Sequence, residues 1–191
     1  MSGRRSLCVS VCSLKALIAE RHPSYETIVV SLEKFANLFK WFGPMFPTSG
    51  ERFLDGMLDV VSNDWFHGDT SKDEAQTLLT LYEKQHKHVE NAFLVRFSYN
   101  EPITKNPFNM SKISKAGSIV HQRIYYEPET GEHFITVKDK GESSRLASKE
   151  GVVGLIRSIM TQSKLLKTVV PRTKYHEIFH RHAEDMGYLD E

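Results

Sequence analysis

Cysteine is nearly absent from the sequence, with only Cys8 and Cys12 in 191 residues. Two neighbouring thiols exclude a disulfide framework and a zinc site built from four thiolates. This usage is typical of a reducing compartment, so we expect a cytoplasmic protein. No apolar run is long enough to span a bilayer, and membrane insertion is not expected. Arg4 and Arg5 precede a short apolar stretch that resembles a signal peptide. Because Lys15 interrupts that stretch, an N-terminal helix or strand is the preferred interpretation.

An excess of one charge is also absent. The chain has 25 basic and 24 acidic side chains, for a formal net charge of +1. Proteins that capture nucleic acid over a broad surface carry a clear basic excess, so no nucleic-acid partner is expected. Recognition of an anion would therefore have to be local, made by a few placed cations.

The motifs of common enzyme classes are missing as well. There is no glycine-rich phosphate loop, no Gly-x-Ser-x-Gly and no kinase signature, so the chain is not predicted to be an enzyme or to need a cofactor. His176, His180 and His182 include a pair spaced one helical turn apart. The glutamate that would make this pair a catalytic zinc motif does not follow the first histidine, and we interpret these side chains as solvated, with no metal site.

What is present divides into two patterns. Apolar residues at helical spacing make residues 1–64 an all-helical segment, with helices over 13–40 and 51–62 and Ser31 as an N-cap. Beyond Trp65 a helix, several short apolar runs and a second helix follow. These predict an α+β fold, an antiparallel sheet with one helix on each face. The predicted strands are 92–97, 108–113, 118–126, 132–137 and 165–170, and the second helix is 148–160.

Arg96 is the most informative residue because it interrupts an otherwise apolar strand, Ala92-Phe93-Leu94-Val95-Arg96-Phe97. A guanidinium stays protonated on burial, and leaving it unpaired costs several kcal/mol. It therefore needs an anion, either an acidic side chain of the protein or a ligand. Periodicity alone favours an internal ion pair or a side chain that reaches solvent.

Three motifs in order resemble an SH2 domain: Trp65-Phe66-His67-Gly68, the helix with Ala75 and Leu78-Leu79, and Phe93-Leu94-Val95-Arg96-Phe97-Ser98. The resemblance covers residues 65–170. It implies an SH2-like sheet flanked by two helices, preceded by a connector, 1–64, and followed by a tail, 171–191. The connector is similar to the helical segment before the SH2 domain in STAT factors, Cbl-type ligases and amoebal SH2-bearing kinases.

The resemblance also implies a function, because SH2 domains read phosphotyrosine through arginine. Arg96 matches the phosphate-binding arginine. Lys72 stands where many members have a second arginine, and Gln122 replaces an aromatic residue at a specificity position. We expect weak sequence preference from Gln122 and from loops at 138–147 and 161–166. The remaining implied phosphotyrosine contacts are Ser98, Tyr99, Asn100, His121 and Arg123.

The expected role is that of an adaptor or of a protein that shields phosphotyrosine in tyrosine-kinase signalling. An SH2-like reader of phosphoserine or phosphothreonine, or a scaffold that binds no phosphate, is the alternative. Tyr188 lies in an acidic tail, and its phosphorylation could pair two chains, although an ordinary exposed tyrosine is the preferred interpretation. Similar stand-alone SH2 proteins occur as effectors of intracellular bacteria, which would place the protein in host cytosol.

Overall fold

The structure is a computed structural model that describes residues 14, 17, 19–21, 28–43, 53–87, 89–99, 102–139, 142–163 and 165–171. These residues form two compact units, one with the described residues up to Asn63 and one from Asp64 to Pro171. None of the helices in the described ranges has the length and apolar character needed to cross a bilayer. Several predicted features lie outside the described residues: the signal-like stretch, Asn100, the histidines of the tail and Tyr188.

The first unit contains two short strands as well as helices. β1 (Ala19–Arg21) pairs antiparallel with β2 (Ile28–Val30). The prediction of continuous helix over 13–40 is therefore wrong for these segments. The run Ile-Val-Val in β2 consists of β-branched residues that favour extended backbone, and Pro23 between the strands is incompatible with a helix interior.

One helix of the first unit begins at the N-cap that the sequence predicts. α2 (Leu32–Phe42) starts after Ser31, whose hydroxyl accepts a hydrogen bond from the Lys34 backbone N–H at 3.2 Å, so the predicted cap is confirmed. α3 (Phe53–Val61) follows. The ring of Phe39 lies 5.7 Å from that of Phe53, centroid to centroid, so aromatic contact joins the two helices.

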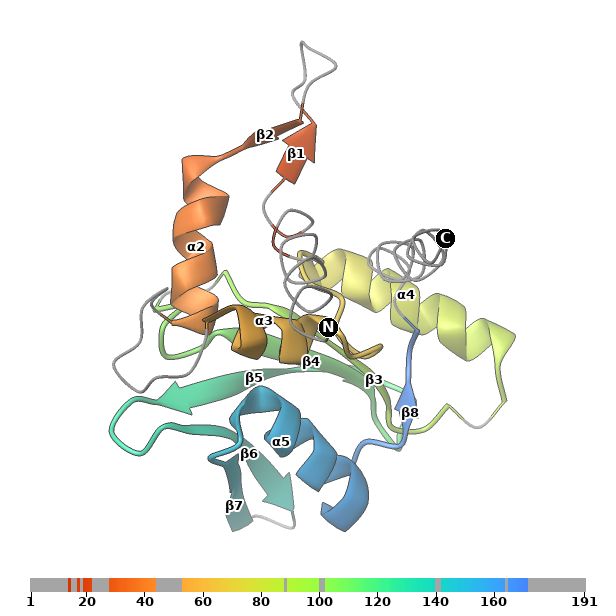
Figure 1. Cartoon of the computed structure of the whole chain (residues 1–191). Coiled ribbons are helices and arrows are strands. Elements are labelled where there is room, and N and C mark those ends of the chain that lie inside the picture. The colour runs from red at the N-terminus through yellow and green to blue at the C-terminus, as the bar shows by residue number, and fades with distance from the viewer. Residues whose placement is uncertain are drawn as a thin grey trace, which may run out of the picture. The chain divides into compact units, whose positions relative to one another are not determined.

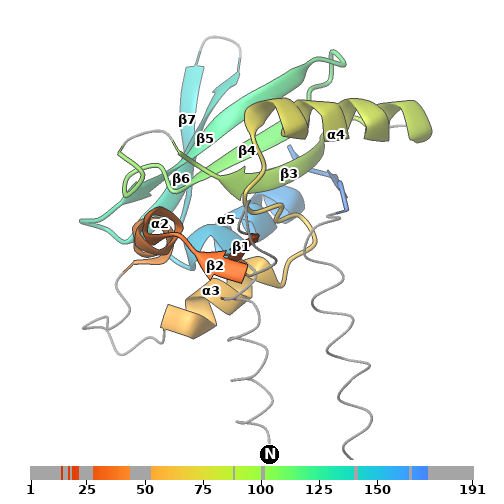
Figure 2. The same cartoon turned by 90° about the horizontal axis from the view of Figure 1, so that it is seen from above.

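The second unit is an α+β, SH2-like domain, as predicted. Among the described residues a six-stranded sheet has the order β7-β6-β5-β4-β3-β8, antiparallel except that β8 runs parallel to β3. Helices α4 and α5 lie on opposite sides of this sheet (Figure 1, Figure 2). The elements are α4 (Lys72–Gln85), β3 (Ala92–Phe97), β4 (Phe108–Ile113), β5 (Ile119–Glu127), β6 (Glu132–Asp139), β7 (Glu142–Ser148), α5 (Gly151–Ser158), the π-helical turn η1 (Ile159–Ser163) and β8 (Thr168–Val169).

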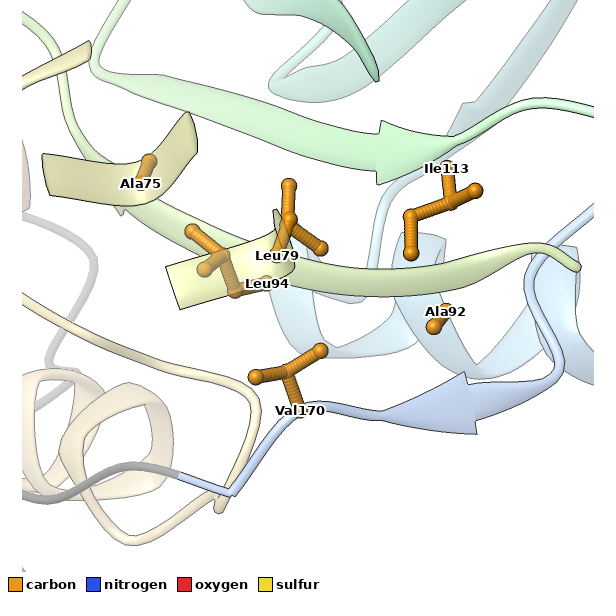
Figure 3. Close-up of a cluster of buried hydrophobic side chains, with 6 residues drawn as sticks. All are labelled: Ala75, Leu79, Ala92, Leu94, Ile113 and Val170. Atoms are coloured by element: carbon orange, nitrogen blue, oxygen red, sulfur yellow. The ribbon is translucent and has the colours of Figure 1, made fainter. Parts of the chain in front are cut away.

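One face of the sheet packs against α4. Ser71 begins this helix with a capping box, because its hydroxyl accepts from the Glu74 N–H at 3.1 Å while its own N–H donates to the Glu74 carboxylate at 2.7 Å. The apolar side of α4 then meets side chains of β3, β4 and the residue after β8 (Figure 3). This cluster consists of Ala75, Leu79, Ala92, Leu94, Ile113 and Val170.

The other face of the sheet carries aromatic side chains. Phe66, Phe97 and Phe108 are at most 1% exposed, and the Phe66 ring lies 5.0 Å from that of Phe97 and 6.3 Å from that of Phe108. Edge-to-face contacts of this kind stabilise the fold beyond what the burial of three large rings contributes. Strand alternation places Phe93, Val95 and Phe97 on this face and leaves Leu94, Arg96 and Ser98 for the α4 face.

Two segments predicted as loops are structured. β7 occupies most of 138–147 and pairs along its length with β6, and η1 extends the second helix to Ser163. The β7 side chains at 143–145 are exposed. An edge strand held by backbone hydrogen bonds rather than by burial need not show apolar alternation, so the sequence pattern did not reveal it.

His133 on β6 makes the stability of the domain depend on pH. Burial lowers the pKa of His133 from 6.5 to about 4, and its Nδ1 has no hydrogen-bond partner among the described residues. Because the folded pKa lies below the unfolded one, stability is complete above pH 6.5 and falls as the pH drops towards 4, by about 3 kcal/mol in all. Urea denaturation at a series of pH values should show this loss.

The variant His133→Phe should flatten that dependence between pH 6.5 and 5, where few carboxylates titrate. His86→Phe, at an exposed histidine next to α4, should retain the wild-type slope and serves as the matched control. Equal slopes for wild type and His133→Phe would contradict the assignment.

Candidate functional site

The segment Trp65–Gly68 fixes the surroundings of Arg96. It runs beside β3, with the His67 N–H donating to the Val95 carbonyl at 2.7 Å and the Phe97 N–H to the Gly68 carbonyl at 2.9 Å. Gly68 has φ +58°, a conformation that glycine adopts without strain. The turn that follows brings the Thr70 carbonyl next to the Arg96 side chain, so the sequence motif before α4 builds one wall of the site.

Arg96 is buried without a compensating charge. Its side chain is 7% exposed, and one guanidinium nitrogen, Nη1, donates long hydrogen bonds to the carbonyls of Thr70 at 3.4 Å and Phe97 at 3.5 Å. Among the described residues its Nε has no acceptor, and no carboxylate forms an ion pair with the guanidinium. Burial lowers the pKa of Arg96, although a guanidinium remains charged at neutral pH. The internal ion pair favoured by periodicity is therefore not found in the described structure.

A polar row crosses the sheet at Arg96. The strand register places Arg96 opposite Asn109 on β4, and Asn109 opposite Arg123 on β5, so the three side chains share the α4 face. Asn109 is 5% exposed, and its Nδ2 has no hydrogen-bond partner among the described residues. Two buried donors, Arg96 Nε and Asn109 Nδ2, are thus unsatisfied at neighbouring positions, which is costly unless an acceptor is bound.

Asn109 was not among the residues predicted from the sequence. The sequence shows a polar residue within a predicted strand. Which residue of the neighbouring strand lies opposite it depends on the strand register. No local signal could have placed it opposite Arg96.

His121 lies in the next row on the same face. The register aligns it with Ser111, and its Nδ1 lies 2.8 Å from the Ser111 hydroxyl. Burial lowers the pKa of His121, and the positive charges of Arg96 and Lys72 lower it further, while Asp73 raises it. His121 is therefore a neutral, partly buried imidazole in a positive electrostatic environment.

The loop after β3 supplies two more of the predicted residues. Ser98 is fully buried, and its N–H donates to the Pro107 carbonyl at 3.0 Å. Tyr99 is 45% exposed, and its hydroxyl donates to the Asp69 carboxylate at 2.6 Å. This bond ties the loop after β3 to the turn before α4.

Gln122 points away from this cluster. Strand alternation puts it on the aromatic face, opposite Met110, while its neighbours His121 and Arg123 face α4. Its Nε2 donates to the Thr136 carbonyl at 2.7 Å. The face towards α4 thus carries Arg96, Ser98, His121 and Arg123, and Lys72 is the first residue of α4, whereas Gln122 lies on the opposite face.

Chemically, this cluster can bind an anion. It combines a buried guanidinium with an unsatisfied amide and two exposed cations, Lys72 and Arg123. Such donors suit phosphate oxygens. In the described ranges no group of three or more histidine, cysteine or acidic side chains could hold a metal ion.

Comparison with known proteins finds similarity to dual specificity kinases of Dictyostelium discoideum. The chain is 33% identical over 114 residues to dual specificity protein kinase shkA of Dictyostelium discoideum, which is 60% of this chain and 20% of the kinase. It is 34% identical over 146 residues to shkD, 73% of this chain and 18% of the kinase, and 37% identical over 100 residues to shkE, 52% and 13%. No protein-family profile matches. The chain thus spans about a fifth or less of these relatives, and it is homologous to one segment of them.

The burial of Arg96 without a carboxylate leads to a stability prediction. Replacing an uncompensated buried charge with an apolar side chain of similar length removes its desolvation cost. Arg96→Met should therefore leave the free energy of unfolding unchanged or raise it by about 1 kcal/mol, as measured by urea denaturation in a buffer without phosphate or sulfate.

Arg145→Met on β7 is the matched control, because this exposed arginine pairs with Glu132 at 3.1 Å and lies over the Phe134 ring. It should cost up to about 1 kcal/mol. A loss of more than that in Arg96→Met would show that Arg96 is needed for stability rather than kept for a ligand.

Proposed function

We propose that residues 65–170 bind tyrosine-phosphorylated peptides, with Arg96 as the principal phosphate ligand. The observation that carries this proposal is the unpaired guanidinium, 7% exposed, beside the unsatisfied amide of Asn109. A ligand with several acceptor oxygens would accept hydrogen bonds from both Arg96 and Asn109. A phosphate monoester carries a charge of roughly −1.5 to −2 at pH 7 and offers three such oxygens.

The arrangement around Arg96 supports a phosphate at the end of a long side chain. Lys72 and Arg123 are exposed, His121 is partly buried, and Arg96 lies deepest. A phosphotyrosine ring is long enough to carry its phosphate to Arg96 while passing the imidazole of His121 and the stem of Arg123. Phosphoserine holds its phosphate close to the peptide backbone, and such a phosphate would meet the outer cations first.

The positive charges of Lys72 and Arg123 would strengthen phosphate binding but would not be enough for it without Arg96. Lys72 is the first residue of α4, and as an ammonium it attracts the phosphate without the planar fork of an arginine. Each charge-assisted hydrogen bond contributes about 1.5–3 kcal/mol. Three or four of them give micromolar affinity, about −8 kcal/mol, after the costs of association.

We further propose that this segment binds rather than catalyses, and that it works in the cytosol as an adaptor or as a shield for phosphotyrosine. Support comes from the relatives, which are kinases matched over a small share of their length. The Ser111 hydroxyl does pair with the His121 imidazole at 2.8 Å, but Ser111 is fully buried and so out of reach of a substrate. In such kinases the corresponding segment would direct the enzyme to phosphorylated proteins.

Fluorescence polarisation with matched peptides tests the proposal. A labelled phosphotyrosine peptide should bind the full chain with roughly micromolar Kd, while the phosphoserine and unphosphorylated versions bind at least tenfold more weakly. Arg96→Met should reduce phosphotyrosine affinity about 100-fold or more, and Arg145→Met should not. Equal binding of the phosphoserine peptide would instead favour a reader of phosphoserine. Arg96-independent binding would favour a scaffold role.

Asn109 provides a second, independent test. Asn109→Leu keeps the approximate volume but removes the amide, so phosphotyrosine affinity should fall about tenfold, the value of one hydrogen bond to a charged group. Because the unsatisfied Nδ2 is removed, the melting temperature should not fall. Unchanged affinity in a folded Asn109→Leu protein would exclude Asn109 from the site.

A further inference from the structure

We propose that Lys112 forms a second cationic subsite, on the face of the sheet opposite Arg96, that binds an acidic side chain of the same phosphorylated peptide. This inference rests on the proposed function and adds the chemical class of a flanking residue to it. The argument uses the strand register, the open edge of β5 and the unneutralised charge of Lys112.

Lys112 lies on the aromatic face at the end of β4. The register places it between Phe93 on β3 and Val120 on β5. Val120 is 39% exposed, one of the few large apolar side chains with that much exposure in the described structure. A ligand resting on Val120 would therefore lie directly beside the Lys112 stem.

The edge of β5 gives a route from one face of the sheet to the other. β5 pairs with β4 over 119–124, but with β6 only over 125–127. In the described structure its outer edge at 119–124 therefore has no paired backbone strand, and β6 reaches it there through the hydrogen bond from the Gln122 side chain to the Thr136 carbonyl. Figure 1 shows β6 and β7 turning away from this part of β5. His121 and Val120 are consecutive residues on opposite faces. A peptide held at Arg96 could cross this edge and reach Val120 within a few residues.

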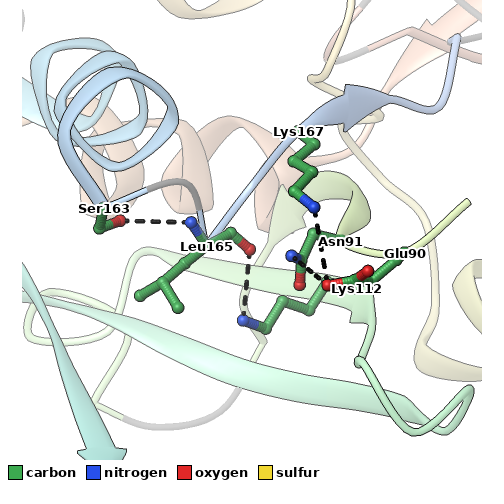
Figure 4. A network of polar contacts seen from close by, with 6 residues as sticks. All are labelled: Glu90, Asn91, Lys112, Ser163, Leu165 and Lys167. Carbon is green, nitrogen blue, oxygen red and sulfur yellow. Dashed lines mark hydrogen bonds and ion pairs between the residues drawn. The ribbon is translucent and has the colours of Figure 1, made fainter.

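The Lys112 ammonium has unused hydrogen-bonding capacity. Its Nζ donates to the Leu165 carbonyl at 3.5 Å, the limit for a hydrogen bond, and no carboxylate of the described residues pairs with it (Figure 4). An ammonium has three donors, so two remain. Burial lowers the pKa of Lys112, and the positive charge of Lys115 lowers it further. A carboxylate placed here would offset both effects.

The acidic side chain nearest in the network is already engaged. Glu90 pairs with Lys167 at 3.6 Å and accepts from Asn91 Nδ2 at 3.4 Å (Figure 4). Lys112 is therefore the member of this group that lacks a counter-charge. A single ammonium suits one carboxylate, whereas a phosphate dianion would need several donors, as at Arg96.

A glutamate scan of the ligand tests the subsite. The probe is the phosphotyrosine peptide with neutral neighbours, into which glutamate or glutamine is placed at each flanking position in turn. Against the full chain, one position should show a gain of about three- to fivefold for glutamate over glutamine, the value of a partly exposed ion pair. The gain should vanish in Lys112→Met and persist in Lys115→Met, the matched control from the exposed turn.

Charge reversal sharpens the test. In Lys112→Glu, lysine at the same peptide position should bind better than glutamine. Thermal melting checks each variant, and Lys112→Gln replaces Lys112→Met if the latter does not fold. A scan with no Lys112-dependent position, while Arg96-dependent binding persists, would overturn this inference and leave the proposed function intact. Absence of Arg96-dependent phosphopeptide binding would overturn both.

Discussion

An uncompensated positive charge in the middle of a buried strand is the constraint on which this domain depends. Arg96 cannot lose its proton, and the described structure supplies two long hydrogen bonds to carbonyls in place of a carboxylate. Leaving such a charge without an anion costs several kcal/mol. A fold optimised for stability alone would place an acid or an apolar side chain there. The cost is understandable if a bound anion completes the site, which is the basis of the proposed function.

The sheet accommodates this charge by carrying different side chains on its two faces. On one face, a capped helix and a small aliphatic cluster leave room for a row of polar side chains at Arg96, Asn109 and Arg123. On the other, the rings of Phe66, Phe97 and Phe108 pack edge to face and supply much of the buried apolar surface. Because side chains alternate along a strand, β3 can carry the charge and the aromatic core at once. The polar row at Arg96 and the aromatic core therefore do not compete for the same strand positions.

Local sequence patterns predicted much of this arrangement. Strands β3 and β4 begin and end where apolar runs predicted them, and the cap at Ser31 was readable because capping is a contact between near neighbours in sequence. β7 escaped prediction because an exposed edge strand buries little and so carries no apolar alternation. The short hairpin of β1 and β2 was misjudged because the spacing of apolar residues was weighed above the β-branched run in β2 and the proline before it.

By itself, the sequence determined the class of fold and the position of Arg96 within a buried strand, because strand periodicity and an arginine within an apolar run are local features. It also excluded broad electrostatic capture, since charge balance is a property of composition. Only the tertiary structure decided what surrounds that cation. Strand register decides that Asn109 faces Arg96 and that Lys112 lies beside Val120 on the other face. It also decides whether a carboxylate reaches Arg96. Register is fixed by packing between segments far apart in the chain, and no single segment encodes it.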